Sequence, residues 1–299
     1  MKRLKAYVGF LSLQLLTIHL VQAQQLTLQV VTKTIEKQWE WQPNKLLKIN
    51  GANAQITVEG WDKNTIAATI ELIAKHTERT TAERDVLAQK VIIETTNKLF
   101  LLGNQIVLEE GQQKPVSNLK AVYTIYVPRE CSVEINNKFG KVELRGIKSK
   151  VRINGQFTNV DLKKINGKIV VGSNFGDIVG QQLTGKVTID ANRSDVQLEQ
   201  PSGDFIIKTQ RGSVTILEDQ NRQFDLSVKG QRANVVFIEP VLLAHNFHLT
   251  TEFGEINLPP SSAFELTETS TNRKEAVLAR GRNATQISVV LSHGDITLK

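Results

Sequence analysis

The strongest constraint on the fold of this chain is a repeat of 18 residues that follows Pro128. Dipeptides at the start of successive apolar segments recur at that step: Phe139-Gly140, Phe157-Thr158, Phe175-Gly176, Arg193-Ser194 and Arg211-Gly212. Within each segment apolar and polar residues alternate, which is typical of a half-buried strand. A second alternating segment follows in each repeat, so every repeat predicts two strands. Beyond Arg211 the step lengthens to 20 or 21 residues.

Residue identities that recur at a whole-repeat offset predict strands that pair with the equivalent strands of neighbouring repeats. We therefore expect an all-β fold, a single-stranded parallel β-helix (β-solenoid) with about 18 to 21 residues per turn. A β-sandwich of hairpins is the alternative, but it does not explain identities at a whole-repeat offset.

The chain divides into three predicted parts. Residues 1–23 have a basic start, an apolar stretch from Ala6 to Leu20 and a small-residue cleavage site at Ala23, which together indicate a signal peptide. Residues 24–130 are expected to form a less regular β-rich region that caps the solenoid, with one short helix over residues 80–89. Thr80-Thr81-Ala82-Glu83 has the pattern of a capping box for that helix. Residues 131–299 are expected to form the solenoid.

Composition fits an exported protein that is stabilised by its fold alone. Cys131 is the only cysteine, so no intrachain disulfide can form, and its apolar surroundings indicate a core residue. Removing residues 1–23 leaves 34 basic and 30 acidic residues, a net charge of about +4. That excess does not indicate a nucleic-acid partner, and the mature chain has no apolar segment long enough to span a membrane.

In the predicted fold, residues one repeat apart stack into columns, and two of these columns are candidate ligand contacts. An aromatic column at a corner could stack against a sugar or could simply seal the core; it holds Phe139, Phe157 and Phe175, continued by Arg193 and Arg211. A cationic column could bind an acidic glycan or a lipid headgroup, or could be a solvated face; it holds Lys150, Lys168 and Lys186. Two further columns are interpreted as structural: the amides Gln156, Asn174, Asn192 and Gln210, and the small residues Gly140, Thr158, Gly176, Ser194 and Gly212.

No catalytic, metal or cofactor site is predicted. His245 and His248 are three residues apart, which on a strand sends them to opposite faces, and isolated surface histidines are the better interpretation. The repeat stacks Glu143 on Asp161 and Asp177 on Asp195, near the separation that glycoside hydrolysis requires. These carboxylates are predicted to lie on an open outer face without loops to form a cleft, so a solvated acidic face is preferred to an active site.

The sequence resembles a bacterial family described as putative adhesins with β-strand repeats. The resemblance covers nearly all of the mature chain and depends on the order of four segments: Leu46-Leu47-Lys48-Ile49-Asn50-Gly51, Val58-Glu59-Gly60-Trp61-Asp62, Tyr123-Thr124-Ile125-Tyr126-Val127-Pro128 and Asn137-Lys138-Phe139-Gly140-Lys141-Val142-Glu143-Leu144. It implies an envelope or surface protein and brings no catalytic residues with it.

Three functions are consistent with these patterns. The first is an exported, non-catalytic scaffold or adhesin-like binding protein in the periplasm or at the cell surface, with an envelope glycan or protein as its partner. The second is a β-helix polysaccharide lyase or hydrolase. The third is a structural protein that assembles end to end, because the last predicted strand, Ile296 to Leu298, has no evident cap.

Overall fold

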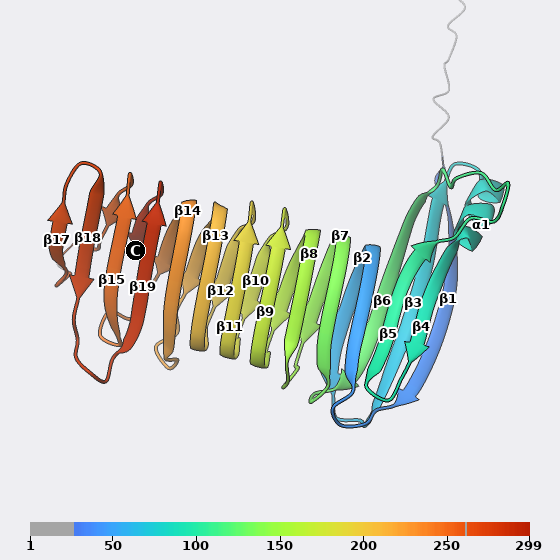
Figure 1. Cartoon of the computed structure of the whole chain (residues 1–299), viewed down its shortest axis with the longest axis horizontal. Coiled ribbons are helices and arrows are strands. Elements are labelled where there is room, and N and C mark those ends of the chain that lie inside the picture. The colour runs from blue at the N-terminus through green and yellow to red at the C-terminus, as the bar shows by residue number, and fades with distance from the viewer. Residues whose placement is uncertain (1–26, 261) are drawn as a thin grey trace, which may run out of the picture.

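The computed structural model describes residues 27–260 and 262–299, and 67% of the structure is strand, with one helix. Hydrogen bonding links the strands into one continuous sheet that bends into two faces around a single core cluster (Figure 1). Residues 1–26 lie outside the described residues, and with them the predicted signal peptide.

Five long strands run from one face to the other: β2 (Leu46–Trp61), β7 (Ser132–Arg145), β8 (Val151–Lys163), β13 (Ser202–Leu217) and β14 (Phe224–Ile238). The first face is completed by β4 (Gln89–Thr95), β5 (Leu99–Ile106), β9 (Asn166–Asn174), β11 (Thr184–Asn192), β15 (His245–Glu252), β17 (Glu265–Thr269), β18 (Arg273–Leu278) and β19 (Thr285–Ser292). The second face is completed by β1 (Gln29–Glu40), β3 (Thr65–His76), β6 (Asn118–Pro128), β10 (Ile178–Gln181), β12 (Val196–Glu199), β16 (Ile256–Asn257) and β20 (Ile296–Leu298).

The expectation of a single-stranded parallel β-helix is wrong, because the chain is not a regular β-solenoid. Six parallel strands close a ring in the order β8, β9, β11, β13, β12 and β10, and many strands lie outside it. β2 lies beside β7 although four strands separate them in the sequence. Antiparallel pairs occur at both ends, β1 with β3 and β3 with β6 at one, β15 with β18 and β18 with β17 at the other.

The predicted register is nevertheless present in the ring and beside it. Ile178 pairs with Val160 on one side and with Val196 on the other, one repeat away each time. The longer step is also found, because Asp204 pairs with Asp225. After β14 the predicted order fails: Gln231 pairs with Ser292 of β19, and Glu252 of β15 pairs with the other side of Ser292. The last strands are thus inserted between β14 and β15.

The helix α1 (Arg79–Ala88) lies where the sequence predicts one and packs against β1 and β3 at the N-terminal end (Figure 1). The expected capping box does not form, because the N-cap is Glu78 and no side chain caps the helix. Asp85 connects the helix to the loop before β6. Its carboxylate accepts hydrogen bonds from the backbone N–H groups of Val116 and Ser117 at 2.9 and 2.8 Å. The helix therefore orders the loop that precedes β6.

Cys131 is fully buried, as the sequence predicts, and burial raises the pKa of its thiol to about 12. It is consequently a protonated core residue at neutral pH and a poor nucleophile.

The predicted open edge at Ile296–Leu298 is also wrong. This strand, β20, pairs with β14 on one side and with β16 on the other. Within residues 27–260 and 262–299, no helix has the length and hydropathy needed to cross a membrane.

Candidate functional site

Successive strands along the molecule form layers, each with one segment on the first face and one on the second. The chain turns from the first face to the second at a corner, where one residue per layer has a positive φ, in the left-handed region of backbone conformation. Its members have φ between 50° and 63° and follow each other along the molecule in the order Asn53, Phe139, Phe157, Phe175, Arg193, Arg211, Arg232, His293 and Phe253. We call this set the corner column. The sequence predicts its first aromatic and arginine members, whereas His293 takes its place between Arg232 and Phe253 because β19 is inserted there.

The aromatic part of the corner column is stacked and exposed. Ring centroids are 5.0 Å apart between Phe139 and Phe157 and 4.8 Å apart between Phe157 and Phe175, with interplanar angles of 10° and 11°. The three side chains are 47%, 42% and 41% exposed, so they do not seal the core. Their faces cover each other, and the outer faces contact Lys138 and the guanidinium of Arg193. A ligand can therefore reach the ring edges but no ring face.

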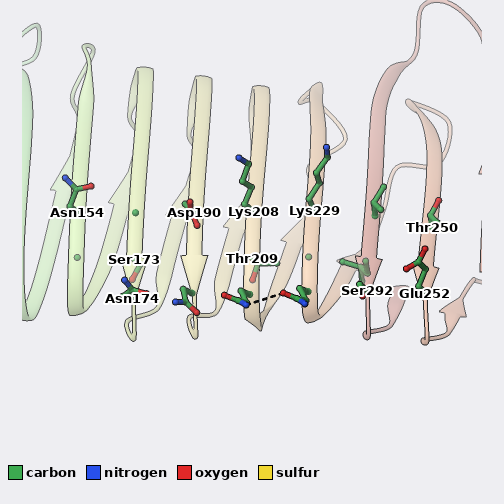
Figure 2. A pocket seen from close by; sticks show the side chains of 18 residues that line it. Asn154, Ser173, Asn174, Asp190, Lys208, Thr209, Lys229, Thr250, Glu252 and Ser292 are labelled. Carbon is green, nitrogen blue, oxygen red and sulfur yellow. Dashed lines mark hydrogen bonds between the residues drawn. The ribbon is translucent and has the colours of Figure 1, made fainter. Parts of the chain in front are cut away.

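A hollow of about 970 Å³ lies on the first face directly beside the corner column (Figure 2). It extends across β8, β9, β11, β13, β14, β19 and β15, and eighteen residues line it. Its floor includes Gly155, Gly172 and Gly230, which have no side chain to fill the space. Figure 2 shows the lining side chains in rows across successive strands, so the hollow runs along the molecule.

One wall of the hollow is formed by the predicted amide column. Asn174, Asn192 and Gln210 line the hollow in register, Gln231 of β14 continues them, and Gln210 Nε2 donates a hydrogen bond of 3.2 Å to Gln231 Oε1. The interpretation of this column as a purely structural ladder is incomplete. Asn192 Oδ1 and the hydroxyl oxygen of Thr209 are buried and have no hydrogen-bond partner among the described residues. Both residues line the hollow.

A second row of the hollow carries charge, and the sequence analysis missed it. Asp190, Lys208 and Lys229 are direct neighbours across β11, β13 and β14 (Figure 2). They occupy the column two residues before the amides, which continues backward through Gly172 and Asn154. The sequence does carry a signal for this row. Two residues before each amide of the wall stands a glycine, Gly172, or a charged residue, as at Asp190 and Lys208.

The predicted cationic column is formed in part beside the same groove. Lys168 pairs with Lys186, and both are exposed, as is Lys150. The next members are Asp204 and Asp225, so the positive charge ends after Lys186. None of the three lysines lines the hollow.

The stacked carboxylates of the second face are bound to the backbone. Asp177 Oδ1 accepts a hydrogen bond of 3.0 Å from the N–H of Asp195, and Asp195 Oδ1 accepts one of 2.7 Å from the N–H of Ser213. The same bond recurs along the column where Asn159, Asn234 and Asp295 accept from the following layer. Glu143 pairs with Lys141 at 2.5 Å, and that bond lowers the pKa of Glu143. Asp177 and Asp195 therefore connect layers to each other, whereas the bond of Glu143 to Lys141 lies within β7.

The histidines are separated, as the sequence predicts, but His245 is not on the surface. It is fully buried, with Nε2 3.1 Å from Glu218 Oε2 and Nδ1 2.5 Å from Thr285 Oγ1. Glu218 Oε2 also accepts a hydrogen bond from the N–H of Val241 at 2.9 Å. This group lies in the core against Phe224 and Phe247 and connects β15 to β19. No group of three or more His, Cys, Asp or Glu side chains in the described part of the chain could hold a metal ion.

Comparison with known proteins gives structural neighbours only. No family model matches the sequence, and no curated protein matches it. A protein described as a putative adhesin from Bacteroides fragilis is 11% identical, with a TM-score of 0.45, over 89% of this chain and 97% of the other. A protein described as a putative lipid binding protein from Parabacteroides distasonis is 13% identical, with a TM-score of 0.41, over 90% and 96%. A putative cell adhesion protein from Clostridium sporogenes is 13% identical, with a TM-score of 0.26, over 89% and 99%.

Proposed function

We propose that this chain is an exported, non-catalytic binding protein of the bacterial envelope, and that a polar polymer, a glycan above all, binds along the hollow. The hollow carries the proposal, because the side-chain amides of Asn174, Asn192, Gln210 and Gln231 line it in register across four neighbouring strands. An amide offers both hydrogen-bond donors and an acceptor, so a row of amides along a surface hollow favours a ligand rich in hydroxyl groups.

The shape of the hollow favours binding over turnover. It extends across seven strands on the outside of one face, whereas catalysis generally needs a site that excludes water. The acid pairs that could serve a glycosidase lie on the second face, and Asp177 and Asp195 are occupied by backbone N–H groups. No observation in the described residues favours the lyase or hydrolase alternative, and none favours end-to-end assembly.

Export and envelope location are part of the proposal and depend on the signal peptide predicted for residues 1–23. The corner column remains a candidate contact, whereas the lysine column does not line the hollow and is not part of the proposed site. Phe139, Phe157 and Phe175 offer ring edges beside the hollow, and Arg193 and Arg211 offer charge. Lys150, Lys168 and Lys186 lie farther from it.

The proposal is tested by glycan-array binding of the full chain and of two double variants. Asn192→Ala with Gln210→Ala removes two amides from the wall of the hollow. Gln181→Ala with Gln197→Ala removes two amides from the second face, where both contact Glu199, and serves as the matched control. We expect the first pair to lose glycan binding and the second pair to keep it.

Two results would contradict the proposal. Equal binding by both double variants would show that the hollow is not the site. Failure of the wild-type chain to bind any glycan or any envelope fraction would remove the binding function itself.

A further inference from the structure

We propose that the hollow and its rim form a site for an acidic polysaccharide, held by a cationic strip. The strip consists of five side chains: Arg193, Arg211 and Arg232 of the corner column, and Lys208 and Lys229 of the hollow. This inference rests on the proposed binding function and adds the charge class of the ligand.

The strip is continuous across three layers of the molecule. Lys208 and Lys229 are direct cross-strand partners, and Figure 2 shows their side chains next to each other. The residues that precede the three arginines, Asn192, Gln210 and Gln231, are themselves in register. Adjacent strands are about 4.8 Å apart. Five positive charges therefore lie within three layers, two in the hollow and three at the corner beside it, and Asp190 is the acid that lies next to Lys208.

These five cations have no ion pair and no side-chain hydrogen bond within residues 27–260 and 262–299. Two half-buried arginines of the chain are paired, by contrast: Arg129 with Asp62, and Arg273 with Glu252, Glu268 and Glu275. Like charges at neighbouring positions repel each other, and the only carboxylates lining the hollow are Asp190 and Glu252. An anionic ligand would relieve that repulsion.

The side chains of the strip suit carboxylate, sulfate or phosphate groups on a polymer. A guanidinium binds such groups with two parallel N–H donors. Arg193 Cζ lies 4.9 Å from the centroid of the Phe175 ring, and the guanidinium makes no side-chain hydrogen bond within the described residues. The amides of Asn192, Gln210 and Gln231 can pair with sugar hydroxyls in the hollow.

The same geometry favours a polysaccharide over a nucleic acid. Proteins that bind single strands stack bases on exposed aromatic faces, and the faces of Phe139, Phe157 and Phe175 are already covered. The long polar groove also suits an extended chain of hydroxylated units.

The experiment measures binding of the full chain to polygalacturonate, to its methyl ester and to dextran at low and at raised salt. The test variant is Arg193→Gln, Arg211→Gln and Arg232→Gln together. The matched control is Lys150→Gln, Lys168→Gln and Lys186→Gln, which removes the same charge from the same face away from the hollow. We expect the wild type to prefer polygalacturonate to its ester, the arginine variant to lose at least about tenfold in affinity, and the control to lose much less. Raised salt should weaken the wild-type interaction.

Several outcomes would overturn the inference. Equal loss by both triple variants would show a general effect of net charge, and unchanged binding by the arginine variant would exclude the strip. Tighter binding of single-stranded DNA or of anionic lipid vesicles than of polygalacturonate would reject the ligand class. If the wild type binds only neutral glycans, and Asn192→Ala with Gln210→Ala abolishes that binding, the proposed function stands and this inference fails. Circular dichroism of each variant checks that it is folded.

Discussion

At the scale of single residues, the column after the corner alternates between glycine and a small side chain. In layer order it reads Ala54, Gly140, Thr158, Gly176, Ser194 and Gly212. A Cβ at Gly176 would lie well inside the contact distance of the Thr158 carbonyl oxygen, and Gly140 and Gly212 meet the layer before them in the same way. A side chain therefore fits at every second layer only. The sequence analysis identified this column as small residues at a tight bend, and the structure supplies the reason for the alternation.

This close approach predicts the effect of Gly176→Ala. The added methyl group must push two layers apart, and overpacking of this kind costs about 1–3 kcal/mol. We expect the free energy of unfolding in urea to fall by that amount. Gly172→Ala is the matched control, because its Cβ would meet only the Asn154 side chain at an ordinary distance, 3.4 Å. A stability equal to that of the wild type in Gly176→Ala would contradict the packing described here.

The sequence is informative about such columns for a physical reason. In-register stacking depends only on the repeat length, so the stacked phenylalanines, the amides and the small residues could all be predicted. The hollow could not, because its depth depends on which side chains are missing at Gly155, Gly172 and Gly230 and on how the face curves. Its two lysines were missed since their column does not repeat a residue type.

At the scale of secondary-structure elements, the order of strands could not be predicted from the repeat. A sequence period indicates which residues align. It does not indicate that β2 pairs with β7, which is distant in the sequence, or that β19 lies between β14 and β15. Contacts of that kind are fixed by side chains far apart in the sequence. The buried group of Glu218, His245 and Thr285 is one of them, and isolated surface histidines were the wrong interpretation of His245.

Asp85 in α1 predicts a pH dependence of stability at the N-terminal end. Burial raises the pKa of Asp85, but hydrogen bonds from Ser117, Arg84 and Val116 outweigh it, so the pKa lies below its ordinary value. A carboxyl group whose pKa is depressed in the folded state contributes stability at any pH above its pKa in the unfolded chain, about 3.9. That contribution is lost as the pH falls through the pKa of the group in the folded state.

We therefore expect Asp85→Asn to lower the free energy of unfolding at pH 7 by about 1–3 kcal/mol and to differ less from the wild type in strong acid. Hydrogen exchange at the amides of Val116 and Ser117 should become faster in the variant. Glu83→Gln, on the exposed side of the same helix, is the control and should change neither. If the difference in the free energy of unfolding between the wild type and Asp85→Asn stayed the same down to strongly acid pH, the proposed role of the Asp85 carboxylate would be contradicted.

At the scale of the whole molecule, the question is what prevents the two faces from adding strands of a second copy. The C-terminal edge of the first face is β17, a short strand with a register shift between Leu266 and Glu268. The C-terminal edge of the second face is β16. It is followed closely by Pro259, a residue without an N–H donor. At the opposite end α1 packs against β1, and β4, the outermost strand of the first face, pairs only with β5 among the described residues. Bulges, charges, prolines and covering helices are the devices that protect sheet edges.

The protected edges at the C-terminal end predict a monomer by sedimentation at high concentration, against the end-to-end assembly that an exposed last strand would have allowed. Glu265→Val with Glu268→Val removes both charges from β17 beside the exposed Leu266, so we expect this variant to associate as its concentration rises. Glu109→Val with Glu110→Val makes the same change in an exposed segment outside any strand and should remain monomeric. Concentration-dependent association of the wild type would show that at least one edge is open. A monomeric β17 variant would show that the register shift alone is enough to prevent pairing.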